Sequence, residues 1–249
     1  PVDGGVLNYA YSQNPRNFNP LDAVQGVQSE ILRFTYNSLL QYDIGFFTDA
    51  IPALAESWEV SDDAKTFTFN LRDDVTWHDG EQFTADDVLF TLTIAVHPDN
   101  PTFWGNSLQT LEGIDAFVAG DADSISGLVA IDDYTVSIST SEPSVVMLDT
   151  LSFIGMLPEH ALSGVAYADL KDDPFFLNSP IGTGPFMVVE VAEDQFVRFE
   201  RNENYFRGAP HLDGINLLVP DASTVPAGLE TGEIDLSRDV GADDLERFL

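Results

Sequence analysis

Apolar and polar residues alternate in several short runs along this chain, and the alternation predicts β-strands. One run is VLNYAY at residues 6–11, and two others, WEV at 58–60 and TFTFNL at 66–71, are joined by the turn SDDAK into a hairpin. Later runs predict further strands: YTVSIST, MVVEV, QFVRFER, INLLVPD and IDLS. Because helical stretches lie between these runs, we expect an α/β fold.

Three stretches show the spacing of apolar positions that is typical of helices. The first covers residues 27–40. The second, at 83–96, has Thr84 as a candidate N-cap, two aspartates in its first turn and Pro98 just after its end. The third, at 224–235, lies between the strand candidates INLLVPD and IDLS, so this region predicts a strand–helix–strand crossover that joins two parallel strands.

The stretch SPIGTGPF at residues 179–186 allows two interpretations. A phosphate-binding loop needs consecutive backbone N–H donors and a helix directly behind them. Pro185 has no N–H, and the residues after it predict a strand. We therefore interpret the stretch as a sharp bend that re-enters a sheet, in which Gly182 and Gly184 supply unusual dihedral angles and Pro185 fixes the new direction.

The charge of the chain excludes some classes of partner. It has 42 acidic and 10 basic side chains, a formal net charge of −32, and its acids are scattered instead of forming a tail. Such an acidic surface repels nucleic acid and anionic lipid, and it resembles the surfaces of halophilic secreted proteins. There is no cysteine and no apolar run of about 18 residues, so disulfides, thiolate sites and a membrane span are not expected.

No motif singles out a catalytic or metal site. The four histidines are not spaced as a helical metal pair, and the calcium-loop-like DADSISGLVAID lacks the required ligand and glycine at its fifth and sixth positions. No G-x-S-x-G motif is present. Carboxylate pairs are so numerous that they neither indicate nor exclude a glycosidase, which remains the alternative of another class.

Five segments together resemble family 5 of the extracellular solute-binding proteins, the peptide- and nickel-binding family that serves ABC importers. The longest is residues 50–92, from AIPALAESWEV to WHDGEQFTADDVLFTL. The others are NPRNFNPLDA, SPIGTGPF, RNENYFRGAPHLDGI and LETGEIDLS. The dipeptide- and oligopeptide-binding members are the most similar in pattern.

The resemblance implies a periplasmic-binding-protein-like fold of class II. It implies a discontinuous first lobe at residues 1–44 and 178–249, with a smaller α+β domain at 45–177 inserted into it. SPIGTGPF would mark the return from the inserted domain. Members of the family are commonly about twice as long as this chain, so we expect the second lobe to be missing.

The resemblance also implies a function. We expect the substrate-binding component of an ABC importer, monomeric and without catalytic activity, metal site or cofactor, that delivers di- or oligopeptides to a membrane permease. It would lie outside the cytoplasmic membrane, in the periplasm or lipid-anchored at the cell surface. An oligosaccharide, a nickel complex or an opine are the alternative cargoes.

Candidate ligand contacts come mainly from the first cleft loop that the resemblance implies. Asparagine and glutamine side chains both donate to and accept from a peptide backbone, and aromatic rings provide apolar walls. In this loop we expect contacts from Tyr11, Gln13, Asn14, Phe18 and Asn19. Three further candidates lie elsewhere in the sequence: Trp104, Arg238 and Asp239.

Overall fold

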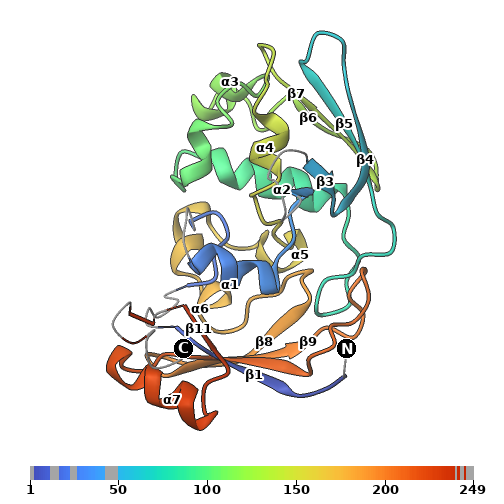
Figure 1. Cartoon of the computed structure of the whole chain (residues 1–249). Coiled ribbons are helices and arrows are strands. Elements are labelled where there is room, and N and C mark those ends of the chain that lie inside the picture. Colours follow the sequence, from blue (N-terminus) through green and yellow to red (C-terminus); the bar gives the residue numbers. More distant parts are fainter. Residues whose placement is uncertain are drawn as a thin grey trace. The chain divides into compact units, whose positions relative to one another are not determined.

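The computed structural model describes residues 3–11, 17–22, 27–42, 50–238, 240–241 and 244, with only the backbone of 27–30 (Figure 1). The chain divides into two compact units. Unit 1 consists of Pro1–Phe18, Pro174–Pro180 and Pro185–Leu249, and unit 2 of Asn19–Asp173 and Ile181–Gly184. No helix among the described residues is both long and apolar enough to cross a membrane. The expected domain boundaries, 44/45 and 177/178, stay a prediction, since compactness alone places residues 19–44 with unit 2.

Unit 1 is built on a five-stranded sheet with the order β11-β1-β10-β9-β8. The two neighbours of β1 both run parallel to it, whereas β9 is antiparallel to β10 and β8 to β9. All five strands confirm the predicted runs: β1 Val6–Ala10, β8 Phe186–Ala192, β9 Phe196–Arg201, β10 Gly214–Leu218 and β11 Leu236–Ser237. The predicted crossover is also confirmed, because α7 (Val225–Thr231), preceded by the short helix η3 (Ala222–Thr224), connects β10 to β11.

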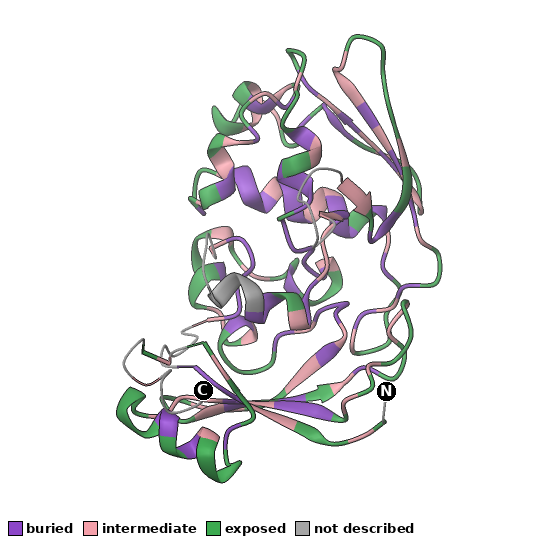
Figure 2. Ribbon diagram, in the orientation of Figure 1, coloured by how far each residue is buried: buried purple, intermediate pink, exposed green. Residues whose placement is uncertain are grey.

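The two faces of this sheet bury different residues, as strand alternation requires. On one face, Tyr9, Phe199 and Leu217 are each no more than 2% exposed. Figure 2 shows buried stretches along the strands of this sheet. On the other, Ala10 packs in a small core with Val225 at the start of α7 and with Ile234. A short helix, α6 (Pro174–Asn178), also lies near β8.

Unit 2 contains a four-stranded antiparallel sheet with the order β4-β5-β7-β6. The hairpin β4–β5 confirms the predicted turn at SDDAK, and α2 is the second predicted helix. Around them lie shorter elements. The bounds are α1 Val27–Thr35, β2 Leu40–Tyr42, β3 Ala50–Pro52, β4 Ala55–Val60, β5 Thr66–Leu71, α2 Ala85–Val96, η1 Phe103–Asn106, α3 Ile114–Val118, β6 Leu128–Asp132, β7 Thr135–Ser139, α4 Met147–Leu151, α5 Glu159–Leu162 and η2 Tyr167–Asp172.

A buried aspartate holds the start of α2. Asp87 is 4% exposed and accepts hydrogen bonds from the backbone N–H of the N-cap residue Thr84 (2.9 Å), from that of Glu159 (2.9 Å) and from the Trp77 indole (3.2 Å). Burial raises the pKa of this carboxyl, while the three donors act in the opposite direction. The sequence predicted the acidic first turn, but the link from α2 to α5 through Glu159 appears only in the folded chain.

The bend at SPIGTGPF is confirmed, but the reason for its glycines was predicted wrongly. Neither Gly182 nor Gly184 has a positive φ. Instead, the segment runs against the end of α1: a Cβ on Gly182 would lie 1.8 Å from the Thr35 carbonyl oxygen, and one on Gly184 would lie 2.4 Å from that of Phe34. The Gly184 N–H donates to the Thr35 carbonyl at 2.8 Å. Close approach of two backbones, and not an unusual dihedral angle, excludes a side chain here.

The side chain of His78 also holds this segment, through one hydrogen bond at each ring nitrogen. The Gly182 N–H donates to Nδ1 at 3.2 Å, so Nδ1 carries no hydrogen and Nε2 donates to the Gly184 carbonyl at 3.0 Å. The backbone N–H of His78 also donates to the Gly182 carbonyl at 2.9 Å. Burial lowers the pKa of His78 to about 4, although the Gly184 carbonyl and Asp79 act in the opposite direction. The ring is therefore neutral at physiological pH.

This histidine should make stability depend on pH. An unfolded chain takes up a proton at His78 below its ordinary pKa of 6.5, and the folded chain does so only near pH 4. The contribution is fully present above the unfolded pKa and is lost as the pH falls toward the folded pKa. We expect the free energy of unfolding to fall by about 2 kcal/mol between pH 7 and pH 5 through this group.

Urea unfolding of the parent and of His78→Gln across this pH range measures the effect. Glutamine keeps an N–H donor but does not titrate, so the variant should lose this part of the pH dependence. Equal pH slopes for the two proteins would show that His78 does not couple to folding.

Candidate ligand-binding site

Three parallel strands of unit 1 end at the same edge of its sheet. In the register of the sheet, Ala10 at the end of β1 lies opposite Leu218 of β10 and Ser237 of β11. The carboxyl ends of these strands therefore lie side by side. Just beyond β1, the backbone N–H of Tyr11 donates to the Leu218 carbonyl at 2.8 Å. In open α/β sheets, ligands bind beyond the carboxyl ends of such strands.

Two candidates from the sequence meet at this edge. Tyr11 directly follows β1 and is 6% exposed, and Arg238 directly follows β11 and is exposed. The two residues are 227 positions apart in the sequence (238 − 11). Only the parallel pairing of β1 with β11 brings them together. Gln13, Asn14 and Asp239, the neighbouring candidates, lie outside the described residues.

Phe18 and Asn19 are both buried. Phe18 is 1% exposed and meets the ring of Phe199 edge-on, with 6.4 Å between ring centroids. Asn19 is also 1% exposed; its Oδ1 accepts from the backbone N–H of Leu21 at 2.9 Å, and its Nδ2 donates to Asp22 at 3.2 Å. These contacts give both side chains a structural role, and ligand contact by either one stays a prediction.

Trp104 belongs to unit 2, where it is the second residue of η1. It is 7% exposed and lies between two rings: Phe103 edge-on at 5.2 Å and Phe153 nearly parallel at 6.3 Å. These neighbours are exposed, at 49% for Phe103 and 44% for Phe153. The sequence pointed to Trp104, but the accessible aromatic surface belongs to its neighbours. Phe153 was missed, because only folding brings it from the end of α4 to η1.

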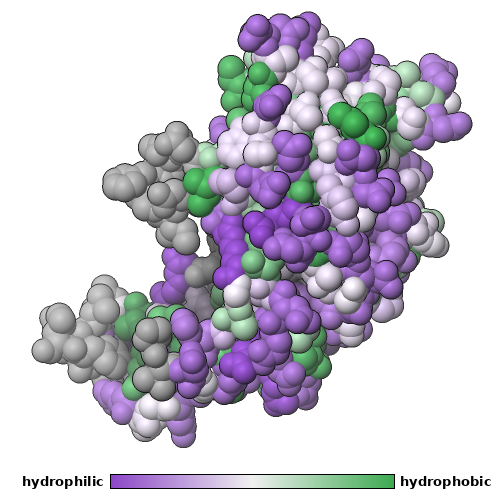
Figure 3. All heavy atoms as spheres, turned by 90° about the vertical axis from the view of Figure 1, so that its right-hand side faces the viewer, coloured by the Kyte–Doolittle hydropathy of each residue, from purple (hydrophilic) through white to green (hydrophobic). Residues whose placement is uncertain are grey.

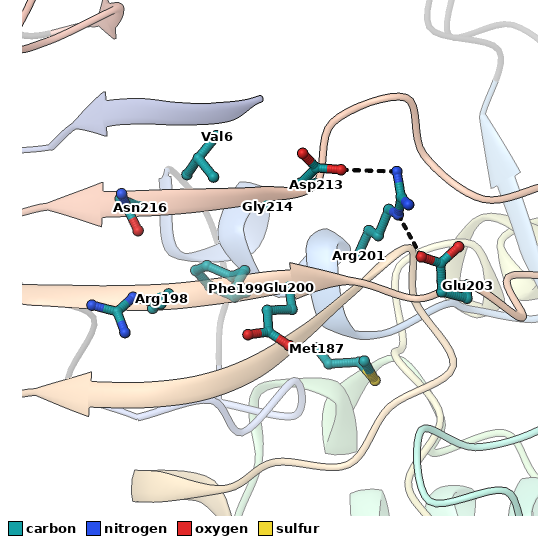
Figure 4. A pocket seen from close by; sticks show the side chains of 10 residues that line it. All are labelled: Val6, Met187, Arg198, Phe199, Glu200, Arg201, Glu203, Asp213, Gly214 and Asn216. Atoms are coloured by element: carbon teal, nitrogen blue, oxygen red, sulfur yellow. Dashed lines mark hydrogen bonds and ion pairs between the residues drawn. The ribbon is translucent and has the colours of Figure 1, made fainter. Parts of the chain in front are cut away.

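Unit 1 also has a hollow of about 540 Å³ that no sequence motif indicated (Figure 4). It lies over the cross-strand row Val6, Gly214, Glu200 and Met187, which includes the amino ends of β1 and β10. At its rim, Arg201 pairs with Glu203 at 2.7 Å and with Asp213 at 3.0 Å. The hollow is thus at the opposite end of the parallel strands from Tyr11 and Arg238, and the charge of Arg201 is already compensated.

The described residues contain no group of three or more histidine, aspartate or glutamate side chains that could hold a metal ion. Figure 3 shows one face that is mainly hydrophilic, with separate hydrophobic patches.

Comparisons with known proteins identify the family. The profile described as "Bacterial extracellular solute-binding proteins, family 5 Middle" matches residues 49–249. A Brucella ovis protein named as an ABC transporter peptide-binding protein is 35% identical over 233 residues, which cover 93% of this chain and 41% of the relative. The chain thus spans less than half the length of the relatives it matches.

Two solved structures share the fold. The oligopeptide-binding protein AppA from Bacillus subtilis, in complex with a nonapeptide, matches with a TM-score of 0.83 and 29% identity, over 94% of this chain and 44% of AppA. NikZ from Campylobacter jejuni, in complex with Ni(L-His), matches with a TM-score of 0.77 and 27% identity, over 92% of this chain and 42% of NikZ. The predicted fold class is thereby confirmed, and the chain belongs to the family 5 bacterial extracellular solute-binding proteins.

Proposed function

We propose that this chain is part of the substrate-binding component of an ABC importer that binds di- or oligopeptides outside the cytoplasmic membrane. The observation that carries the proposal is the match with peptide-bound AppA over 94% of the chain. The parallel-strand edge that bears Tyr11 and Arg238 supports it, since this is where an α/β sheet offers loop backbone to a ligand.

The candidate side chains suit a peptide. A peptide backbone presents alternating donors and acceptors, which the amides of Gln13 and Asn14 can meet in both directions. Arg238, with Asp239 beside it, offers opposite charges to the groups of a peptide. Tyr11 adds an aromatic surface that tolerates varied side chains. Binding and release need no bond making, so we propose that the chain has no catalytic step and needs no cofactor.

Partners and location follow from this role. A binding component must dock on a membrane permease after closing on its ligand. We propose that the protein acts as a monomer at the outer side of the membrane, held there by a lipid anchor or confined to a periplasm. The net charge of −32 favours neither nucleic acid nor an anionic lipid surface as a partner.

One second candidate is favoured by a specific observation. The fold match with NikZ, which holds Ni(L-His), supports a metal–amino acid complex as cargo on the same scaffold. Such cargo brings its own ligands, so a protein metal cluster is not required. An oligosaccharide, an opine and a glycosidase activity remain alternatives to be tested.

The proposal is tested by mass spectrometry of co-purifying small molecules. The protein that is purified contains this chain and is as long as the relatives. We expect peptides of two to about ten residues, enriched over a matched purification in which Arg238→Ala replaces the parent. If a nickel–histidine complex or a sugar co-purified instead of peptides, the proposed peptide cargo would be wrong. Hydrolysis of chromogenic glycosides, abolished by a single Asp or Glu substitution, would overturn the binding role itself.

A further inference from the structure

Three arginines in the described part of the chain lie over phenylalanine rings, and two of them, Arg33 and Arg198, differ in one respect. The guanidinium carbon of Arg198 lies 5.5 Å from the centroid of Phe196, and that of Arg33 lies 5.9 Å from the centroid of Phe153. Arg198 is paired with Glu190 at 2.7 Å. Arg33 has no carboxylate oxygen within 4.0 Å among the described residues, although the chain contains 42 acidic side chains. Within the described part of the chain, no ion pair therefore compensates its charge.

The ring beneath Arg33 is part of an ordered aromatic platform. Phe153 is 44% exposed, and its other neighbours are Trp104, nearly parallel at 6.3 Å, and Tyr42, tilted at 5.5 Å. Phe103, which is also exposed, meets the ring of Trp104 edge-on. The packing holds the ring of Phe153 while part of the ring stays exposed, which is what a stacking surface for a ligand requires.

The carboxylate of Asp149 forms no ion pair with Arg33. The Asp149 carboxylate accepts a short hydrogen bond from the Tyr42 hydroxyl, and burial together with this bond raises the pKa of Tyr42 to about 12. Tyr42 therefore keeps its proton and holds Asp149. Arg33 lies in the last turn of α1 and is exposed, and its guanidinium lies over the ring of Phe153.

An exposed guanidinium that has no ion-pair partner among the described residues and lies over a partly exposed ring matches one class of ligand group. A carboxylate can form two parallel hydrogen bonds with the planar guanidinium, and an apolar or aromatic body can lie on the ring. A neutral group would gain only the apolar contact. A second cation would be repelled.

We propose that Arg33 and Phe153 form a subsite for a carboxylate that carries an apolar or aromatic group. The proposal rests on the proposed function in one respect: a peptide with an apolar C-terminal residue presents this group. Trp104, whose ring is nearly parallel to that of Phe153, is a positioning residue.

The test uses three small probes and the 249-residue chain. Titrations followed by NMR chemical shifts compare 3-phenylpropionate, its neutral amide 3-phenylpropanamide, and acetate. We expect the acid to bind about tenfold more tightly than the amide, because hydrogen bonds to a charged group are lost in the amide. Acetate, which has no apolar body, should bind more weakly than 3-phenylpropionate. Equal dissociation constants for acid and amide, or no binding of the acid up to its solubility limit, would overturn the proposal.

Matched variants identify the residues. Arg33→Gln should weaken the acid about tenfold and leave the amide unchanged. Phe153→Ala should weaken both. Arg198→Gln is the control, since this arginine also lies over a ring but is already paired with Glu190. If Arg198→Gln weakened the acid as much as Arg33→Gln does, the charge of Arg33 would have no specific role.

Peptides separate this subsite from the proposed function. A peptide ending in Phe should bind more weakly when its C-terminus is amidated, and Arg33→Gln should remove the difference. A peptide that binds equally well in both forms would eliminate the subsite while the peptide-binding role stands. Failure of every peptide to bind when this chain is part of a protein as long as its relatives, with the small-probe result intact, would eliminate the role but not the subsite.

Discussion

Replacing Gly182 or Gly184 by alanine should lower the free energy of unfolding by about 3 kcal/mol or more. A Cβ on Gly182 would lie 1.8 Å from the Thr35 carbonyl oxygen, and one on Gly184 would lie 2.4 Å from the Phe34 carbonyl oxygen. Both obstacles are backbone atoms at the end of α1, so no side chain can rotate away. Relief requires the whole segment to move, which would also stretch its hydrogen bonds to His78 and Thr35.

Urea unfolding of each variant measures the loss. Gly164→Ala is a matched control in unit 2, because a Cβ at Gly164 would meet no atom within 4 Å and its φ is not positive. The control should change stability by no more than about 1 kcal/mol, in either direction. Variants at Gly182 and Gly184 that unfold at the same urea concentration as Gly164→Ala would contradict the close approach described above.

The second large effect concerns affinity. The 249-residue chain should bind peptides about a thousandfold more weakly than the same chain carried within a protein of its relatives' length. Good pockets bury roughly 70–90% of a ligand, and one lobe of a two-lobed binding protein covers only part of it. Peptide groups on the open side then keep their hydration, and about 4 kcal/mol of contact is enough to account for the factor.

Calorimetry of both proteins with a library of di- to pentapeptides decides the point. We expect millimolar or weaker binding by the chain alone and micromolar or tighter binding by the longer protein. The control is 1H–15N NMR of the short chain, which must show a folded protein. Micromolar binding by the folded 249-residue chain would mean that it holds a complete site.

Local patterns predicted most of the regular structure. Every predicted strand is present, because alternation between faces is a property of neighbouring residues and is visible without the rest of the fold. Two kinds of strand were not predicted from the sequence. The strands β2 and β3 have three residues each, and β6 has a mainly exposed pattern that does not alternate. In such strands, pairing with a neighbour and not the segment's own pattern decides the conformation.

The site was predictable only in part. The strand–helix–strand pattern in residues 215–237 predicts that two strands run parallel, so the exit of β11 near Arg238 could be anticipated. That β1 lies between those two strands, with Tyr11 beside them, depends on pairing across more than 200 residues. The same holds for Phe153, which becomes part of an aromatic platform only when α4 folds next to η1.

The segment SPIGTGPF shows where the sequence's own information ends. By itself, the sequence determined that residues 179–186 bend and enter a strand, because proline and glycine act on their own backbone. The tertiary structure alone decided why Gly182 and Gly184 must be glycines: the backbone of Thr35, some 150 positions earlier (182 − 35 = 147), occupies the space of a side chain. The tertiary structure also decided that His78 is neutral, since burial against this segment and not the residue's neighbours in sequence lowers its pKa.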